Sequence, residues 1–393
     1  MPKHCIFVGS AVLAGASLFA LAASADIWRV GYLPGWEQAA LPASNIDYTV
    51  LSHVIHFAVV PNSDGTLNTS ANNISSTNSS DLVLRAHSAG RRVLVCVGGA
   101  GSEAGFQGAT SASNLPLFVN NLTNFVAARG YDGVDLDWEP LTAADAPQYT
   151  NLVNGLRSAL NGFASRKMLT AAVGAYATYG DPPGSEYSLF AGLQRQFDQI
   201  NIMTYDLSGP YAGWVTWFNS PIFDGGFRFP SSGALLPSVD GSVCGFISNG
   251  VSPGKLGIGL PFYGYVWTGT NITLPRLSWN NAPKVMQLPY KAIIAGYYQS
   301  NRYHWDTNAQ SAYLDITNEN PANDLFISYD DQRACLCKVN YAKSHGLGGI
   351  MIWELAQDHE PAQSDSLVQA LKQALGTPGL SMRSAADPVA AAR

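Results

Sequence analysis

Residues 131–140 read YDGVDLDWEP and place four acidic residues in an otherwise apolar stretch. Alternating polar and apolar residues are typical of a β-strand, in which successive side chains point to opposite faces. On such a strand Asp135, Asp137 and Glu139 share one face, about 6.6 Å apart at each step. Asp132 lies lower, at the start of the strand. The segment therefore predicts a strand with one acidic face and one apolar face.

Eight short apolar runs recur along the chain, with helical or loop material between them. A repeated order of apolar strand and amphipathic helix is typical of a parallel sheet covered by helices. Eight such units predict an α/β fold, namely a (β/α)8 TIM barrel over residues 26–375. Such a barrel usually has ~250 residues before insertions, so this interval leaves room for extra segments. The predicted strands lie at 28–34, 50–60, 91–99, 131–139, 168–176, 197–206, 255–265 and 347–355.

The spacing of these runs is uneven in two places. Residues 266–346 contain short alternating patches and a possible helix at 332–346. Because this interval is too long for a bare loop, it predicts a small α+β insertion between strands seven and eight. Residues 207–253 are rich in Gly, Pro and aromatic residues and are expected to form walls beside the barrel mouth. The tail, residues 376–393, is expected to be disordered.

The N-terminal residues 1–25 are typical of a signal peptide. Lys3 supplies the charge, a long apolar run follows, and Ala-Ser-Ala at 23–25 forms a small-residue cleavage site. The run ends in small residues without a stop-transfer pattern, which disfavours a membrane anchor. We therefore expect a secreted protein without an anchor.

The amino-acid composition indicates which kinds of binding partner this protein is expected to have. The chain has 393 residues, a net charge of -6 and no long basic cluster, so a nucleic-acid surface is not expected. It carries 9 Trp, 18 Tyr and 16 Phe, and such rings can line a groove that grips sugars. No metal-site spacing or cofactor motif occurs, and we expect a monomer. Cys244 could pair with Cys335 or Cys337, which spacing alone leaves open.

The stacked acids predict acid–base chemistry. Three carboxylates facing one barrel axis cannot all ionise easily, so they are expected to share a proton. Glu139, nearest the C-terminal mouth, is then expected to stay protonated near neutral pH as a general acid. A solvated acidic face would not explain the alternating Val, Leu and Trp, and a calcium loop would need turn residues instead.

The segment DGVDLDWE resembles the D-x-x-D-x-D-x-E signature of family 18 glycoside hydrolases, the chitinases, and the resemblance covers residues 28–375. It implies that Glu139 protonates the glycosidic oxygen, Asp137 orients the acetamido group of the substrate, and Asp135 holds and relays the shared proton. It also implies a retaining mechanism in which that acetamido oxygen attacks the anomeric carbon and forms an oxazolinium.

The resemblance extends to the ends of other strands. Tyr205 of MTYD would donate its hydroxyl to the acetamido carbonyl, with Met203 and Asp206 in the same subsite. Trp353 would form the floor where the sugar distorts. Three further aromatic positions complete the substrate-binding prediction: Tyr32 beneath the acids, Trp36 as a platform for a distant sugar, and Phe57 as a packing residue.

Some positions depart from the family pattern. Cys96 stands where a hydroxyl often bonds the lower Asp, which is expected to shift the pH optimum because a thiol is a weaker donor. Ala100 stands where an aromatic platform is frequent. The seventh strand reads PFYGY where many relatives place an Arg after the Gly, so its contact with the insertion is not predicted by the resemblance. Trp214 and Trp217 align loosely with sugar platforms.

Three functions are compatible with this pattern. The favoured reading is a chitinase that hydrolyses β-1,4-linked N-acetylglucosamine polymers. An endo-β-N-acetylglucosaminidase acting on N-glycans uses the same motif, although the long insertion disfavours it. A chitin-binding lectin on the same fold would typically lack the terminal acid, and Glu139 is present.

Overall fold

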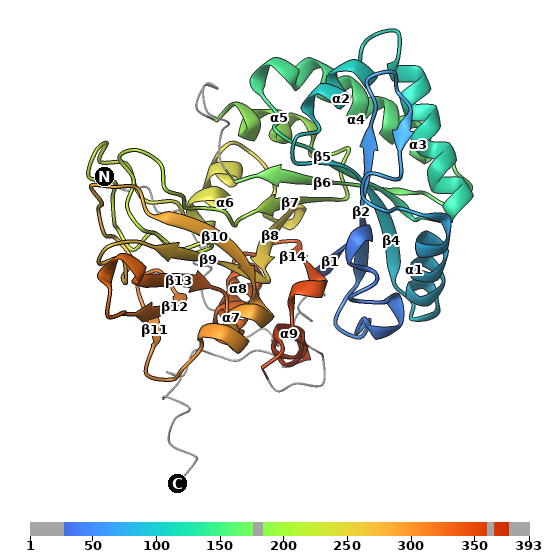
Figure 1. Ribbon diagram of the computed structural model, residues 1–393. Coiled ribbons are helices and arrows are strands. Elements are labelled where there is room, and N and C mark those ends of the chain that lie inside the picture. The colour runs from blue at the N-terminus through green and yellow to red at the C-terminus, as the bar shows by residue number, and fades with distance from the viewer. Residues whose placement is uncertain (1–26, 176–183, 360–364, 377–393) are drawn as a thin grey trace, which may run out of the picture.

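The computed structural model describes residues 27–175, 184–359 and 365–376. The predicted TIM barrel is confirmed by eight parallel strands that close into a ring through the pairing of β1 with β2 (Figure 1). The barrel strands are β1 (Trp28–Pro34), β2 (His53–Pro61), β4 (Arg92–Gly99), β5 (Gly133–Trp138), β6 (Met168–Gly174), β7 (Gln199–Met203), β8 (Leu256–Pro261) and β14 (Gly349–Trp353). A short strand, β3 (Leu67–Asn68), pairs antiparallel with β2. The predicted signal peptide and residues 377–393 of the predicted tail lie outside the described residues.

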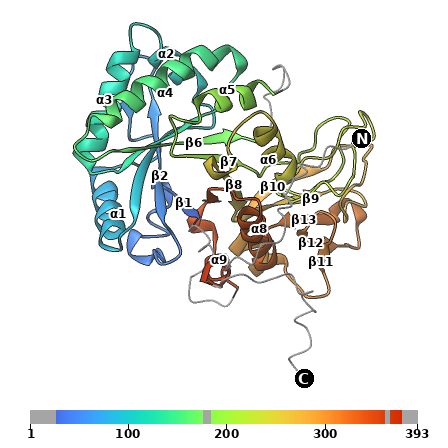
Figure 2. The ribbon, with the colours of Figure 1, turned by 180° about the vertical axis from the view of Figure 1, so that it is seen from behind.

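Helices cover the outside of the barrel, as Figure 2 shows from behind. Their apolar faces pack on the strands, because amphipathic helices bury one stripe against a sheet. Those around the barrel are α1 (Ser76–Ser88), α2 (Glu103–Ala109), α3 (Leu115–Arg129), α4 (Ala146–Asn161), α5 (Ser185–Leu193), α6 (Val239–Ser248), α8 (Gln332–Ser344) and α9 (Leu367–Gly376). Short 3-10 turns are η1 (Gly35–Glu37), η2 (Ala43–Asn45), η3 (Ala143–Asp145), η4 (Pro253–Lys255), η5 (Pro321–Asn323) and η6 (Leu355–Gln357).

Strand β5 shows the predicted alternation of faces. Val134, Leu136 and Trp138 are buried in the layer between strands and helices. The Trp138 ring stacks on Phe106 of α2, with centroids 4.5 Å apart. This packing fixes which face of β5 looks into the barrel, since a one-residue slip would exchange the two faces.

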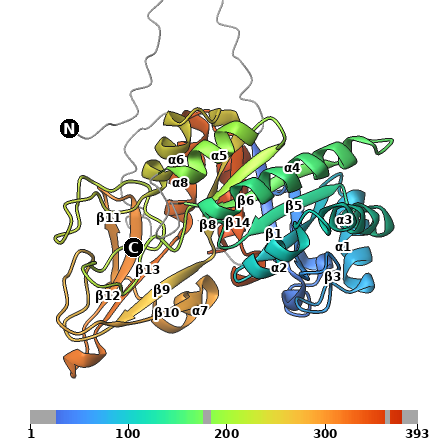
Figure 3. The ribbon, with the colours of Figure 1, turned by 90° about the horizontal axis from the view of Figure 1, so that it is seen from above.

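The insertion is a second, antiparallel sheet beside the barrel, which Figure 3 shows from above. Its strand order is β10-β9-β13-β12-β11, with α7 (Tyr290–Tyr297) packed on β9 and β10. The strands are β9 (Tyr263–Thr268), β10 (Lys284–Pro289), β11 (Tyr303–Asp306), β12 (Ser311–Ile316) and β13 (Leu325–Tyr329).

The observed insertion differs from the predicted interval 266–346 at both ends. Its first strand, β9, begins at Tyr263, inside the apolar run that we assigned to the seventh barrel strand. Helix α8 packs mainly against α9 and β8 and less against β14 and β12 of the insertion, so it belongs to the barrel. A helix before the eighth strand is what the β/α repeat requires, and only its position after β13 made it look like part of the insertion.

The sequence left open whether Cys244 pairs with Cys335 or with Cys337. Cys335 and Cys337 lie on α8 rather than on a strand, and within the described residues no disulfide joins Cys244 to either of them. In the same part of the chain, the helices are too short or too polar to span a bilayer.

Candidate active site

A cleft of about 370 Å³ opens at the C-terminal ends of the barrel strands. Active sites of TIM barrels form at this end, because the loops and strand ends converge there. Most of the predicted site residues line this cleft, from four different strands or the residues that follow them. They are Tyr32, Trp36, Asp137, Glu139, Met203, Tyr205, Asp206 and Trp353. Asp135 lies below the cleft, in the barrel interior.

Asp135 is fully buried and held by side chains from three other barrel strands, β1, β4 and β6. Tyr32 donates its hydroxyl to Asp135 Oδ2 at 2.8 Å, and Thr170 donates to Oδ1 at 2.5 Å. Burial raises the pKa of Asp135 to about 6, while hydrogen bonds from Thr170, Tyr32 and Cys96 act in the opposite direction. The group is therefore positioned to change charge within the working pH range of most enzymes.

Asp137 and Glu139 form the upper pair of the acidic face and are hydrogen-bonded to each other. Burial raises the pKa of Asp137 well above its usual range, and the charges of Glu139 and Asp135 raise it further. Burial also raises the pKa of Glu139, against the hydrogen bond from Asp137. One proton is therefore shared between two carboxylates, as in other coupled acid pairs.

Asp137 is the more buried of the two carboxyl groups, and its burial favours the protonated form of the pair. The second oxygen of Asp137, Oδ1, is buried and has no hydrogen-bond partner within the described residues. A buried acceptor without a donor is costly, so this oxygen is available to a ligand N–H or O–H.

Tyr205 and Met203 reach the cleft from the end of β7. Burial raises the pKa of Tyr205 well above its usual value, with the charge of Asp137 acting in the same direction. Its hydroxyl therefore stays protonated. The Tyr205 hydroxyl donates to Met351 Sδ at 3.8 Å, and sulfur is a weak acceptor. The Tyr205 hydroxyl can therefore turn to a stronger acceptor in the cleft.

Asp206 joins the barrel to the insertion. Its Oδ1 accepts hydrogen bonds from the hydroxyls of Tyr263 at 2.6 Å and Tyr265 at 2.8 Å, and from Gln287 Nε2 at 3.3 Å. The carboxyl is exposed in the cleft, yet the surrounding walls reduce its hydration and raise its pKa, against the two tyrosine hydrogen bonds. Tyr265 follows the Gly of PFYGY, so here this contact between barrel and insertion is made by neutral groups.

Aromatic rings form one side of the cleft. Trp353 packs edge-on against Phe57, with centroids 4.7 Å apart, and Phe57 packs edge-on against Trp36 at 5.7 Å. Trp36 is 47% exposed and presents an open face, whereas Phe57 is 7% exposed. Phe57 therefore serves as packing between two rings that can contact sugar.

Two other predicted rings have different surroundings. Trp217 is fully buried and donates its indole N–H to the Pro237 carbonyl at 2.7 Å, so its prediction as a sugar platform is wrong. Trp214 packs against Tyr211 and Phe229 in the loop that follows β7, and it does not line the cleft. These aromatic rings of residues 207–253 pack within the loop, and no residue of this fully described segment lines the cleft, contrary to the expectation that it forms walls there.

The end of β4 approaches the acids closely because it carries glycine. Gly98 has φ 114°, and a Cβ there would overlap the carbonyl oxygen of Asp137. Such a backbone conformation also disfavours any side chain. The GG sequence therefore allows β4 and β5 to lie together beneath the cleft.

Sequence reasoning missed two polar side chains next to the acids. Thr170, on β6 in register with Asp135, is the one polar residue among Leu, Ala and Val neighbours, and period-two alternation could have identified it. Ser102 accepts a hydrogen bond from the Glu139 backbone N–H at 3.3 Å. It lies before a short helix, and no local pattern distinguishes it.

The charge around the site is uniformly negative. As far as the described residues show, neither Lys nor Arg lines the cleft, although three carboxyl groups do. Nor does the described chain contain a group of three or more His, Cys, Asp or Glu side chains arranged to hold a metal ion. The carboxyl and hydroxyl groups that line the cleft can transfer protons and form hydrogen bonds.

The chain matches the model of the family described as Glycosyl hydrolases family 18 over residues 29–358. It belongs to glycosyl hydrolase family 18. Chitinase A1 of Niallia circulans is 31% identical over 299 residues, which cover 69% of this chain and 40% of that protein. The chain thus spans less than half the length of this relative.

Two solved structures support the family 18 assignment at the level of the fold. The Group IV chitinase of Ostrinia furnacalis, in complex with allosamidin, has a TM-score of 0.76 at 22% identity, covering 89% of this chain and 99% of that one. The class V chitinase of Nicotiana tobaccum, in complex with NAG4, has a TM-score of 0.71 at 25% identity, again covering 89% and 99%. The family recognised from DGVDLDWE is therefore confirmed.

Proposed function

We propose that this protein is a secreted chitinase that hydrolyses the β-1,4 linkages of N-acetylglucosamine polymers by a retaining, substrate-assisted mechanism. The observation that carries the proposal is the proton-sharing pair Asp137–Glu139, whose Asp137 Oδ1 is buried without a donor. The acetamido N–H of an N-acetylglucosamine unit is a donor suited to this oxygen. A glucose unit has no such group.

The first step breaks the glycosidic bond. The shared proton moves from Asp137 to Glu139, and Glu139 delivers it to the glycosidic oxygen as the bond to the anomeric carbon breaks. The acetamido oxygen of the same sugar attacks that carbon, which produces a positively charged oxazolinium. Asp137 is now ionised, so its negative charge appears beside the nitrogen that becomes positive.

The second step restores the enzyme. Water attacks the anomeric carbon and transfers its proton to Glu139, which acts as a base, and the oxazolinium opens to the acetamide. Two displacements at one carbon retain the β configuration. Tyr205 would hold the acetamido carbonyl during both steps, and the buried charge of Asp135 would stabilise the positive charge above it.

The cleft walls support an oligosaccharide as the substrate. Trp36 and Trp353 offer ring faces for sugar units, and Asp206 offers a carboxylate. The Nicotiana tobaccum chitinase was crystallised with NAG4, which supports a ligand of this type. Secretion is proposed from the charged, apolar and small-residue order of residues 1–25.

Proton NMR of fresh products from the N-acetylglucosamine hexamer tests the proposal. We expect an initial excess of the β anomer within minutes of mixing. An initial α excess would mean inversion and would overturn the mechanism. Tight binding without turnover would favour the lectin, and cleavage of an N-glycopeptide with no cleavage of the hexamer would favour the endo-β-N-acetylglucosaminidase.

A further inference from the structure

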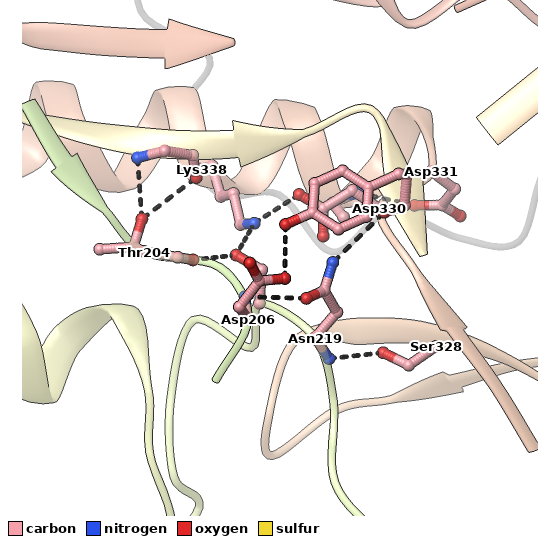
Figure 4. Close-up of polar contacts among 11 residues, drawn as sticks. Thr204, Asp206, Asn219, Ser328, Asp330, Asp331 and Lys338 are labelled. Atoms are coloured by element: carbon pink, nitrogen blue, oxygen red, sulfur yellow. Dashed lines mark hydrogen bonds and ion pairs between the residues drawn. The ribbon is translucent and has the colours of Figure 1, made fainter. Parts of the chain in front are cut away.

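Lys338 of α8 is a fully buried lysine outside the cleft. It is 0% exposed, and its Nζ donates to Asp330 at the end of β13 and to Ser220 Oγ. Figure 4 shows this cluster and the residues around it. Burying an ion pair removes two charges from water, so such a pair is weak evidence for stability and needs another explanation.

The contacts of Lys338 lead directly to the strand end that carries the site. Ser220 Oγ accepts from Lys338 and donates to the carbonyl oxygen of Thr204, the residue before Tyr205. The Thr204 hydroxyl in turn donates to the Gly259 carbonyl of β8 at 3.1 Å. The lysine therefore fixes the orientation of a hydroxyl that holds the backbone next to Tyr205.

Asn219, next to Ser220 in the sequence, holds the backbone of the residue that follows Tyr205. Asn219 Oδ1 accepts a hydrogen bond from the Asp206 backbone N–H at 2.9 Å (Figure 4). The Asn219 N–H itself donates to Ser328 Oγ of β13 at 2.8 Å. Asp206 has φ 57°, a left-handed conformation that non-glycine residues adopt only when the surroundings hold them there.

We infer that Lys338 and Asp330 are positioning residues for the proposed hydrolysis: acting through Ser220, they hold Thr204 and thereby the side chains of Tyr205 and Asp206. The pair joins three parts of the fold, namely helix α8, the insertion strand β13 and the end of β7. The inference rests on the proposed function, because Tyr205 and Asp206 act only if that cleft binds the substrate.

A purely structural role makes a different prediction. If the pair only fills space, an apolar pair of similar size should replace it without loss, because buried ion pairs can often be exchanged for packed hydrophobic residues. Stability and turnover would then recover together. A positioning role predicts that stability recovers and turnover does not.

The test compares Ser220→Ala with the double variant Lys338→Met/Asp330→Leu. Ser220→Ala keeps the buried pair and removes its link to Thr204, so it avoids an unpaired buried charge. The matched control is Ser242→Ala, which removes a buried hydroxyl that donates to the Ser238 carbonyl on α6, away from the cleft.

The measurements are melting temperature, kcat and KM on the N-acetylglucosamine hexamer, and calorimetric affinity for the same hexamer. We expect kcat to fall about tenfold in Ser220→Ala and in the double variant, since small displacements of a reacting group have effects of that size or more. The affinity of both variants for the hexamer should weaken a few-fold, and Ser242→Ala should match the unmodified protein in kcat and in affinity.

Normal kcat and affinity in either a folded Ser220→Ala or a folded double variant would overturn the inference. Failure of the proposed function has a separate signature, because the unmodified protein would then bind the hexamer without turnover or ignore it. With binding alone, the affinity ratio between Ser220→Ala and Ser242→Ala still decides the positioning role.

Discussion

The hydroxyl of Tyr265, on the first strand of the insertion, donates a hydrogen bond of 2.8 Å to Asp206 Oδ1 at the end of β7. This contact crosses the boundary between the insertion sheet and the barrel. Tyr263, two residues earlier, donates to the same oxygen at 2.6 Å. Two neutral phenols thus fix a cleft carboxylate.

Tyr265→Phe tests this contact while keeping the ring. The loss of one donor leaves Asp206 less firmly held, so KM for the hexamer is expected to rise about three- to tenfold, with a smaller change in kcat. Steady-state kinetics provide the measurement. Tyr290→Phe is the matched control, because its hydroxyl donates to the Asp365 carbonyl away from the cleft. An unchanged KM in Tyr265→Phe would contradict a role for the contact.

Glu139→Gln removes the group that the proposed mechanism assigns to protonate the leaving oxygen. We expect kcat to fall by about a thousandfold or more, while calorimetric affinity for the hexamer stays within a few-fold, because general acid catalysis acts in the transition state. Glu319→Gln, in an exposed loop of the insertion, should be fully active. Retention of more than a few per cent of activity would show that another group is the acid.

Cys96→Ser tests how the thiol sets the charge of Asp135. A hydroxyl is a stronger donor, so it should stabilise the ionised carboxylate and lower the pKa of Asp135 below its value of about 6. Because ionised Asp135 favours the positive intermediate, the acid limb of the kcat/KM profile should move about half a pH unit toward acid. Cys335→Ser replaces a buried thiol on α8 and should leave the profile unchanged. A shift toward alkaline pH would contradict this role.

Asp132 is an acid of the same motif with a structural task. It accepts hydrogen bonds from the Val93 N–H at 2.8 Å, from the His87 ring at 2.7 Å and from Arg92 at 3.0 Å. Burial would raise its pKa, but these contacts outweigh burial and lower the pKa from 3.8. Asp132→Asn is expected to lower the free energy of unfolding by about 1.5–3 kcal/mol at pH 7 and to leave kcat within twofold.

The loss of stability in Asp132→Asn should depend on pH, in a direction that follows from the lowered pKa of Asp132. A carboxyl whose pKa is lowered by folding stabilises the protein above its unfolded value, here 3.8, and the stabilisation disappears as pH falls through the lower folded value. The difference in melting temperature between the unmodified protein and Asp132→Asn should therefore be constant above about pH 5 and become smaller below pH 4. A gap that widened in acid would contradict the assignment.

Trp36→Ala tests the exposed ring as a platform. Loss of one stacking face should raise KM for the hexamer about tenfold, equivalent to about 1.4 kcal/mol, and should affect the trimer less because a shorter chain need not reach that ring. Kinetics on both oligomers provide the comparison. Equal effects on hexamer and trimer would place Trp36 next to the scissile bond instead.

The barrel could be predicted because its information is local. The strand period, the helix period and the acid spacing of β5 each depend on neighbouring residues, and Val134, Leu136 and Trp138 indicate the outward face without any tertiary knowledge. The same locality explains why Asp137, Glu139 and Tyr205 could be assigned to one cleft. They lie at strand ends that a closed barrel must bring together.

The errors arise where distant segments meet. Helix α8 was assigned to the insertion because its sequence follows β13, and only its packing on β8 and β14 shows that it belongs to the barrel. Trp217 was expected in the cleft because exposure of an aromatic ring cannot be read from a loop sequence. Asn219 and Ser220 carry no signal at all, since their role depends on residues 13 or more positions away.

The close approach of Gly98 to the Asp137 backbone has an evolutionary consequence. Any lineage that keeps the acid pair is confined to glycine there, because every other amino acid adds the Cβ that Asp137 excludes. Two positions later, Ala100 is exposed on the same turn and lines the cleft. Selection can therefore vary the reach of the binding groove at residue 100 while the catalytic floor stays invariant, and directed evolution for longer oligosaccharides should begin at that codon.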